Sequence, residues 1–321
     1  MKILVTPTSM KPGDPRLKRL EDAADELVFN PTGKPLSEDA LIGLLEGCEG
    51  YLAGLDQVTE RVLRSCPELK AISRYGVGYD RVDVKSADAL GIPVAVTPGA
   101  NAEAVGELSF AMMMSLARHI PELDASTKNG GWKHSAGIEL YGKTLAIIGL
   151  GAIGKVVARC AGGLCMKVIA YDPYIDLGYC EKNGIESVSY QEAVSRADFI
   201  SLHLPLLDST RHIVNEQTIQ WMKNGVILLN CSRGGLLDEE AVCRAMESGK
   251  IAGLGVDAFE IEPPGDSPLF RFPNVIATPH TGAHTKEASD NMAGMAVENL
   301  LDLLGGKECR FAVGAVKKVR G

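Results

Sequence analysis

Three short segments carry side chains that could reduce a carbonyl group. Arg233 follows an apolar run at 225–230, Glu262 lies in an acidic segment, and His280 ends a run that starts at residue 275. A 2-keto acid needs a guanidinium group for its carboxylate or carbonyl, and a proton donor for the oxygen that becomes a hydroxyl. A histidine beside a carboxylate can supply that proton, because the carboxylate favours imidazolium. Taken singly, Glu262 is better explained as part of a solvated turn than as a catalytic group. For Arg233 and His280, taken singly, a surface position explains the residue as well as a catalytic role does.

A glycine-rich turn indicates a dinucleotide site. A predicted strand leads into GLGAIG at 149–154, a helix follows, and the next predicted strand ends in Asp172. In this order Gly149 makes the tight turn, Gly151 lets the backbone approach a pyrophosphate, and Gly154 lets the helix pack closely on the strand. Asp172 would bind the adenosine ribose and repel a 2′-phosphate, which favours NAD over NADP. The alternative is a plain glycine turn, with Asp172 opening an Asp-Pro turn.

The elements that position these residues alternate along the chain, as in an α/β protein with mostly parallel sheets. We predict strands at 2–7, 50–55, 70–75, 92–97, 144–150, 167–172, 198–203, 225–230, 252–258 and 275–280. Two long helical patterns, at about 99–120 and 284–304, are the expected crossings between two lobes. The segment 121–140 has neither helical nor strand period, and we expect an extended arm or loop there.

The length of 321 residues also favours two lobes. We predict two Rossmann-like, doubly wound parallel-sheet domains, with the cofactor domain inserted into a discontinuous, flavodoxin-like substrate domain. The predicted NAD-binding domain is 99–285, and residues 1–98 and 286–321 form the predicted substrate-binding domain. The catalytic cleft is expected between them.

Composition argues against several classes of protein. The chain has 33 Lys and Arg against 41 Asp and Glu, so it lacks the basic field that nucleic-acid binding requires. The first residues, MKILVTP, have too short an apolar run for a signal peptide, and no charge-free apolar stretch is long enough to span a membrane. The eight cysteines form no CxxC pair, which favours reduced thiols in a cytoplasm over disulfides or a structural zinc site. We therefore expect a cytoplasmic protein with a small anionic substrate and no metal, nucleic-acid or membrane partner.

Seven motifs in order resemble the NAD-dependent D-isomer-specific 2-hydroxyacid dehydrogenase family, with phosphoglycerate-dehydrogenase-like members nearest. They cover essentially the whole chain: RYGVGYDRVD (74–83), TPGANAEAVGE (97–107), GLGAIG (149–154), HLPL (203–206), NCSRGG (230–235), VDAFEIEPP (256–264) and PHTGAH (279–284). The resemblance implies interconversion of a D-2-hydroxyacid and its 2-keto acid, with Arg233, Glu262 and His280 as catalytic residues. His280 would protonate the carbonyl oxygen while NADH delivers hydride to the carbon, and would be the general base in oxidation.

The motifs also imply binding residues. Those for the cofactor are Gly149, Gly151, Ala152, Ile153, Gly154, Asp172, His203, Pro205, Thr210, Cys231, Arg233, Asp257 and His280. Those for the substrate are Arg74, Val77, Gly78, Asn101, Arg233 and His280. The glycine-flanked turn at 76–78 could offer backbone N–H groups to a carboxylate. Asn101 could equally cap a helix, and Cys231 could be a small buried residue. The histidines at 119, 134 and 212 receive no role.

The substrate stays open at this stage. Phosphoglycerate dehydrogenases usually carry an Arg-Ser-x-Thr element after the second strand, whose arginine binds phosphate. Here Leu55 and Asp56 stand where the basic residue and the serine are expected, so a phosphate would meet the Asp56 carboxylate unless Arg74 or Arg81 compensates. Candidate substrates are 3-phosphoglycerate and its keto acid, glyoxylate, hydroxypyruvate and D-lactate-type acids. A non-catalytic, NADH-sensing corepressor-like protein is the alternative from another class, and the intact Arg, Glu and His set argues against it.

The resemblance further implies a homodimer formed through the cofactor domain. The methionines at 112–114 and the arm around Gly130-Gly131-Trp132 are consistent with such a contact, because Met-rich and aromatic surfaces often form interfaces. They could equally belong to the core of a monomer. The chain ends at Gly321 without the serine-binding extension of longer phosphoglycerate dehydrogenases, so we expect no control by a fused regulatory domain.

Overall fold

The computed structural model describes residues 1–319, and the chain divides into two compact units. Unit 1 contains the residues up to Asn101 together with those from Thr285 onward, and unit 2 is Ala102–His284. The chain therefore passes from unit 1 into unit 2 after Asn101 and returns to unit 1 after His284. Each unit has its own sheet, with a hydrophobic core on either face.

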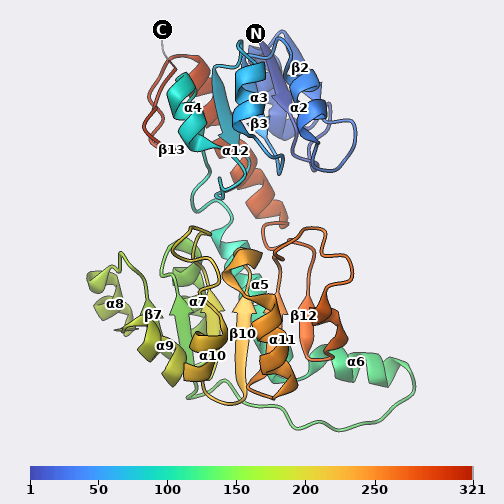
Figure 1. Ribbon diagram of the computed structural model, residues 1–321, viewed down its shortest axis with the longest axis vertical. Helices are drawn as coiled ribbons and strands as arrows, with labels where there is room; N and C mark the ends of the chain where they lie inside the picture. Colours follow the sequence, from blue (N-terminus) through green and yellow to red (C-terminus); the bar gives the residue numbers. More distant parts are fainter. Residues whose placement is uncertain (320–321) are drawn as a thin grey trace. The chain divides into compact units, whose positions relative to one another are not determined.

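Unit 2 is built on a seven-stranded sheet in the order β12-β11-β10-β9-β6-β7-β8, with parallel pairing throughout (Figure 1). The strands are β6 (Thr144–Ile148), β7 (Lys167–Tyr171), β8 (Glu186–Ser187), β9 (Phe199–Leu202), β10 (Val226–Asn230), β11 (Ile251–Val256) and β12 (Val275–Ala277). From β8 to β11 this is the strand order of a dinucleotide-binding sheet, whose direction of winding reverses between β6 and β9. Ligands of such sheets bind beside that reversal, at the carboxyl ends of the strands.

Helices cover both faces of this sheet, which is why its central strands are continuous apolar runs. The helices of unit 2 are α5 (Ala102–Ala117), α6 (Ile120–Lys128), α7 (Ala152–Gly163), α8 (Leu177–Asn183), α9 (Tyr190–Arg196), α10 (Glu216–Trp221) and α11 (Glu239–Glu247). One core contains Met113 of α5 and Val157 of α7, and the other contains Val194 of α9 and Val242 of α11. Both cores hold the strand ends, and hence the loops that follow them, in place.

Helix α6 corrects the expectation of an irregular segment at 121–140. Pro121 stands in its first turn, Glu122 follows it, and Lys128 lies in the last turn, where each type is favoured. None of its residues is buried. A helix without an apolar stripe gives no periodic signal, so the sequence pattern missed it. Residues 131–140 form neither helix nor strand.

Unit 1 has a six-stranded sheet in the order β13-β5-β4-β3-β1-β2. Its strands are β1 (Lys2–Val5), β2 (Glu26–Phe29), β3 (Gly50–Ala53), β4 (Ala71–Arg74), β5 (Val94–Ala95) and the antiparallel β13 (Ala312–Val313). Its helices are α1 (Lys18–Ala23), α2 (Glu38–Leu45), α3 (Glu60–Ser65), α4 (Val84–Leu90) and α12 (Lys286–Leu304). The order from β2 to β5 is that of flavodoxin-like sheets. The long helix α12 packs on β3, β4 and β5, so the last part of the chain completes the first.

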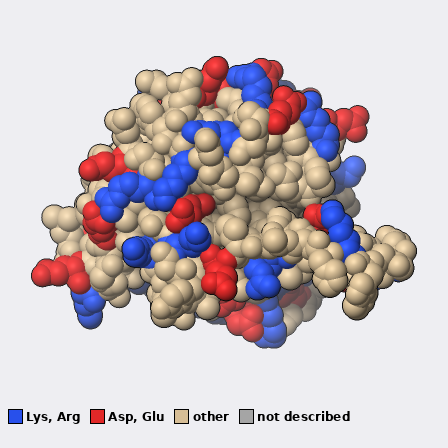
Figure 2. Space-filling model, turned by 90° about the horizontal axis from the view of Figure 1, so that it is seen from below, with Lys and Arg blue, Asp and Glu red and all other residues tan. Residues whose placement is uncertain are grey.

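The surface carries charges of both signs. Figure 2 shows Lys and Arg interspersed with Asp and Glu on one face of the described chain. No helix within residues 1–319 combines the length and the apolar character needed to cross a bilayer. All eight cysteines are free thiols.

Candidate active site

The glycine-rich turn joins β6 to α7 as a dinucleotide site requires. Gly149 has φ +101°, a conformation that favours glycine. A Cβ on Gly154 would lie 2.2 Å from the carbonyl oxygen of Gly149, so only glycine lets the helix sit this close to the turn. The N-cap residue of α7, Gly151, has no side chain to bond the first N–H groups of this 12-residue helix. Those N–H groups suit an anion such as a pyrophosphate, and the turn therefore fits NAD.

Asp172 lies beside this turn, directly after β7. Its Oδ2 accepts a hydrogen bond from the Leu150 N–H and its Oδ1 from the Tyr174 N–H, each at 2.8 Å. The two bonds fix the carboxylate against the glycine turn while each oxygen keeps a second lone pair. Asp172 thus opens a local turn, and its oxygens can still accept hydrogen bonds from a ligand. The two interpretations from the sequence are compatible.

The segment after β9 lies beside the glycine turn. A Cβ on Gly149 would lie 2.7 Å from the His203 backbone carbonyl, so the two turns are in contact. The Thr210 hydroxyl donates to the Pro205 oxygen at 2.7 Å and accepts from the Leu207 N–H at 2.8 Å, which closes the loop on itself. Burial lowers the pKa of His203 to about 4. His203 is therefore a neutral imidazole near pH 7 and adds no charge to this part of the site.

Cys231 and Arg233 follow β10. The Cys231 thiol is buried and its Sγ lies 3.7 Å from Met112 Sδ. Burial raises the pKa of Cys231 to about 12, so it stays a thiol and packs as a small buried residue. Arg233 is half-buried, and its backbone oxygen accepts a hydrogen bond from the Asn230 side chain at 2.9 Å.

Glu262 and His280 form the central pair of unit 2. Glu262 Oε1 lies 2.8 Å from His280 Nδ1, and it also accepts from the Phe259 N–H at 3.2 Å. The side chains are 19% and 33% exposed respectively, so the pair is partly shielded from water while the imidazole can still be reached. Because the carboxylate occupies Nδ1, Nε2 is the nitrogen that can exchange a proton with a substrate oxygen.

The Asp257 carboxylate holds the turn that carries His280. It is 2% exposed and accepts from the Thr281 and Gly282 N–H groups, each at 2.7 Å, and from the Thr278 hydroxyl at 2.5 Å. The sequence motif assigned Asp257 to the cofactor. In the structure its oxygens accept three hydrogen bonds from residues 278–282, and these bonds fix the turn that carries His280.

Two contacts that the sequence did not suggest bring the loops of Arg233 and Glu262 together. A Cβ on Gly234 would lie 1.9 Å from the Phe259 carbonyl carbon, so the two backbones touch. Glu260 Oε1 lies 3.2 Å from His212 Nε2 and 3.7 Å from Arg211 Nη1, which ties the same loop to the segment after β9. His212 received no role from the sequence, because nothing in its neighbourhood along the chain indicates a partner 48 residues away.

The predicted substrate residues Arg74, Val77, Gly78 and Asn101 all belong to unit 1. The Arg74 guanidinium is 4% exposed and donates to the Gly78 oxygen at 3.0 Å and the Ala53 oxygen at 3.1 Å. It therefore supports the turn at 76–78 from within. Asn101 is the last residue before α5.

The expectation that Asp56 faces a bound phosphate is wrong. Its carboxylate is 2% exposed and accepts hydrogen bonds from the Tyr51 hydroxyl at 2.8 Å, the Leu36 N–H at 2.7 Å and the Thr6 hydroxyl. Burial and the nearby Asp56 charge raise the pKa of Tyr51, so Tyr51 stays a hydrogen-bond donor. This buried cluster joins the ends of β1 and β3 and leaves no acidic group on the loop surface at position 56.

Unit 2 thus offers, at the carboxyl ends of neighbouring parallel strands, an anion-binding helix start, a ribose acceptor, an arginine and a carboxylate-paired histidine. This set can bind a dinucleotide and protonate or deprotonate an oxygen. Within residues 1–319, no three His, Cys, Asp or Glu side chains are grouped closely enough to hold a metal ion.

Comparison with known proteins points the same way. Residues 110–282 match the family model for the D-isomer specific 2-hydroxyacid dehydrogenase NAD binding domain. A hydroxypyruvate reductase of Thermotoga maritima is 41% identical over 300 residues, which are 89% of this chain and 96% of that enzyme. The crystal structure of an Aquifex aeolicus D-lactate dehydrogenase, complexed with NAD and lactic acid, has a TM-score of 0.84 at 29% identity and covers 95% of this chain and 96% of its own.

Longer relatives match over part of their length. A D-3-phosphoglycerate dehydrogenase of Methanocaldococcus jannaschii is 45% identical over 254 residues, which are 78% of this chain and 48% of that enzyme. The chain spans about half the length of such curated relatives.

Proposed function

The chain belongs to the D-isomer-specific 2-hydroxyacid dehydrogenase family, and we propose that it is an NAD-dependent oxidoreductase that interconverts a D-2-hydroxyacid and its 2-keto acid. The observation that carries this proposal is the His280–Glu262 pair, with Nδ1 and Oε1 2.8 Å apart, on the sheet edge that also carries the glycine turn. The matching relatives are named for 3-phosphoglycerate and for hydroxypyruvate, and both remain candidate substrates at this level.

The roles of this chain's residues follow from their chemistry. In reduction, His280 donates the Nε2 proton to the carbonyl oxygen, and Glu262 stabilises the imidazolium that must be present beforehand. In oxidation the same nitrogen takes the hydroxyl proton. Arg233 binds the carboxylate and polarises the carbonyl, since its fork of N–H groups matches two oxygens. Bound NADH supplies the hydride that reduces the carbonyl carbon.

For the cofactor, we propose that the helix start after Gly149 holds the pyrophosphate, with contributions from Ala152 and Ile153 at the first positions of α7. Asp172 binds the ribose hydroxyls, and its charge disfavours the extra phosphate of NADPH. In this proposal unit 1 is the substrate-binding domain and unit 2 the NAD-binding domain. A measured preference for NADPH over NADH would contradict the role of Asp172.

The test is oxidation of NADH, followed at 340 nm with a panel of 2-keto acids, in the wild type and in His280→Gln. We expect a loss of roughly 10²–10⁴ in kcat with unchanged NADH affinity, because a positioned proton donor contributes about that factor. His284→Gln, which alters an exposed histidine four residues away, is the matched control and should keep wild-type rates. A non-catalytic NADH sensor would bind NADH and oxidise none with any 2-keto acid.

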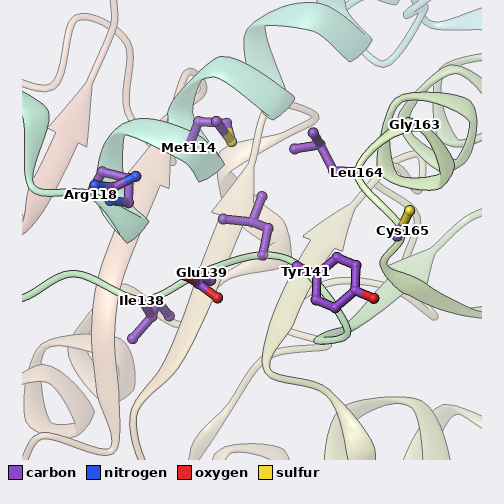
Figure 3. Close-up of a pocket in the computed structure, with 9 residues that line it drawn as sticks. Met114, Arg118, Ile138, Glu139, Tyr141, Gly163, Leu164 and Cys165 are labelled. Atoms are coloured by element: carbon purple, nitrogen blue, oxygen red, sulfur yellow. The ribbon is translucent and has the colours of Figure 1, made fainter.

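We further propose a homodimer formed through unit 2. Met112 and Met113 belong to the core, whereas Met114 is 37% exposed, and Trp132 and Tyr141 are 81% and 73% exposed. Met114 and Tyr141 line a groove of about 440 Å³ between the end of α5, the 138–141 segment and the residues at the end of α7 (Figure 3). Exposed aromatic and methionine side chains around a groove suit burial against a second copy.

The test of the dimer is the molar mass in solution, measured by light scattering. We expect twice the 34.2 kDa of one chain, and a shift toward one chain in Tyr141→Asp. Leu177→Asp, at another exposed apolar position of unit 2, should keep the dimer mass. A wild-type mass of one chain at micromolar concentration would contradict the proposal.

We also propose a cytoplasmic location, which the eight free thiols support because secreted proteins usually pair their cysteines. Titration of the denatured protein with a thiol reagent, purified without reductant, should find eight thiols.

A further inference from the structure

His212 lies between β9 and α10, and its backbone is fixed against the loop that carries Arg233. The His212 N–H donates a hydrogen bond to the Gly235 oxygen at 2.8 Å. Two residues further on, Val214 forms a parallel bridge with Leu237, so the two segments run side by side. Gly235 follows Arg233 by two residues. His212 therefore keeps a fixed place beside the Arg233 loop.

The imidazole of His212 reaches a second loop, which carries Glu262. His212 Nε2 lies 3.2 Å from Glu260 Oε1, and Arg211 Nη1 lies 3.7 Å from the same oxygen. The Glu260 N–H also donates to Glu239 Oε1 at 3.2 Å, at the start of α11. Glu260 precedes Glu262 by two residues. His212 thus contacts both of the loops whose side chains form the proposed site in unit 2.

Apolar packing holds only one end of the segment around Glu260. Phe259 is buried, whereas the next apolar residue, Ile261, is 75% exposed. The backbone from 260 to 262 therefore depends on polar contacts for its position. Glu262 Oε1 lies 2.8 Å from His280 Nδ1, and this distance is kept only while that backbone stays in place.

The backbone of His212 adopts a conformation that suits other residue types better. Its φ is +49°, in the left-handed region that glycine and asparagine adopt with least strain. An asparagine would relieve the strain, but its amide nitrogen stands one bond closer to Cα than the Nε2 of histidine. The imidazole therefore occupies a position where a shorter side chain would favour the backbone, which indicates that its reach to Glu260 is what matters.

We propose that His212 is a positioning residue, which acts through Glu260 to hold the Glu262 carboxylate in register with Arg233. This inference rests on the proposed function, because it concerns the same site. In this role His212 transfers no proton and binds no substrate, and it fixes the loops after β10 and β11 against each other. A displacement of about 1 Å in a catalytic group can cost about 10²-fold in rate, and a partial shift of this loop costs less.

The experiment compares His212→Asn with His212→Gln, two uncharged amides that differ in reach. The amide nitrogen of glutamine stands as many bonds from Cα as Nε2 does, so it can still donate to Glu260, whereas that of asparagine falls short. With the best 2-keto acid of the panel, we expect kcat to fall about five- to tenfold in His212→Asn and to stay within about twofold of the wild type in His212→Gln. The Kd for NADH should be unchanged in both variants.

Thermal stability separates positioning from a merely structural role. A structural role predicts a lower Tm in His212→Asn, in step with the lost activity. We expect a Tm equal to or above that of the wild type, because asparagine relieves the strain of the left-handed backbone and an exposed ion pair adds little stability.

His119→Asn is the matched control. His119 is also left-handed, with φ +53°, and its side chain makes no capping bond to α6. The same exchange should therefore keep the wild-type kcat. The double variant His212→Asn with Glu260→Gln tests the route of the effect, since residues that act through one contact do not lose activity independently. Its kcat should equal that of His212→Asn alone.

Each measurement can contradict the proposal. Wild-type kcat in His212→Asn, an equal loss in His212→Gln, a lower Tm in His212→Asn, or losses that multiply in the double variant would each overturn the inference and leave the proposed function standing. If the wild type oxidises NADH with no 2-keto acid, the proposed function fails, and the inference with it.

Discussion

Gly234→Ala is the change that should most directly separate the Arg233 loop from the Glu262 loop. Gly234 is buried and immediately follows Arg233, and an added Cβ would lie 1.9 Å from the Phe259 carbonyl carbon and 2.2 Å from the Glu260 nitrogen. Real Cβ atoms essentially never approach closer than 3.0 Å. Both close contacts are with backbone atoms, so no side chain can rotate away. The two loops must therefore part by roughly 1 Å, since interiors this closely packed do not absorb an added methyl group.

The displaced segment leads to Glu262 within two residues, and the Glu262–His280 distance of 2.8 Å depends on it. A misplacement of about 1 Å in a catalytic group can cost about 10²-fold in rate. We expect kcat/KM to fall about a hundredfold in Gly234→Ala, with NADH affinity much less affected because the glycine turn after β6 lies in another loop. Overpacking of this kind costs about 1–3 kcal/mol of unfolding free energy, which calorimetry would detect as a lower Tm.

The matched control is Gly162→Ala in α7, where no atom lies within 4 Å of the added carbon. It should keep the wild-type rate and gain up to about 1 kcal/mol, because alanine is the better helix former. The reasoning fails if Gly234→Ala turns over at the wild-type kcat/KM.

Three further changes test other contacts of the site. Asp257→Asn should lower the unfolding free energy by about 2 kcal/mol or more in urea titrations, since the side-chain amide has a single acceptor oxygen and its NH2 group would leave a buried N–H without an acceptor; unchanged stability would contradict the positioning role. Glu260→Gln should lower kcat/KM several-fold with almost no change in Tm, because exposed ion pairs contribute only about 0.2–1 kcal/mol, whereas Glu186→Gln, at a similar pair with Arg196, should alter neither. Burial lowers the pKa of His203 in the folded protein to about 4, so between about pH 4 and pH 6.5 the unfolded chain binds a proton at this residue more tightly than the folded chain. The contribution of His203 to the free energy of unfolding is therefore complete above pH 6.5 and is lost as the pH falls toward 4. In His203→Gln the acid side of the pH–stability curve should be shallower by about 2 kcal/mol over that interval, after allowance for the partial exposure of the residue; a curve parallel to the wild type would count against it.

The sequence predicts well those parts of the fold whose signal lies in residues that are consecutive along the chain. The alternation of apolar strands and helices, and the GLGAIG turn between β6 and α7, are local signals, and the two parallel sheets follow from them. Short strands at sheet edges, such as β2, β8 and β13, were not predicted because a few residues carry no period. Helix α6 was missed for the related reason that it buries no side chain.

The same distinction between local and distant signals applies to the site. The sequence could identify Glu262 and His280 as candidates, but their 2.8 Å contact depends on a loop and a turn fixed by distant residues. Asp56 shows the limit most clearly. Its neighbours along the chain gave it an exposed position opposite a substrate phosphate, whereas Thr6 and Leu36, some 50 and 20 residues earlier, hold it inside unit 1. Partners at such separations are set by sheet order, which no local pattern encodes.

The backbone of His280 gives an independent reason to regard the turn at 278–282 as functional. Its φ is +52°, in the left-handed region that non-glycine residues rarely adopt, at a cost of about 1–3 kcal/mol. The three hydrogen bonds to the Asp257 carboxylate are charge-assisted and buried, and together they are strong enough to offset that cost. A turn selected for stability alone would place glycine or asparagine here, because these residues adopt the conformation with least strain. A histidine kept in this conformation by a buried carboxylate, and paired at Nδ1 with a second carboxylate, is held there for what its imidazole does.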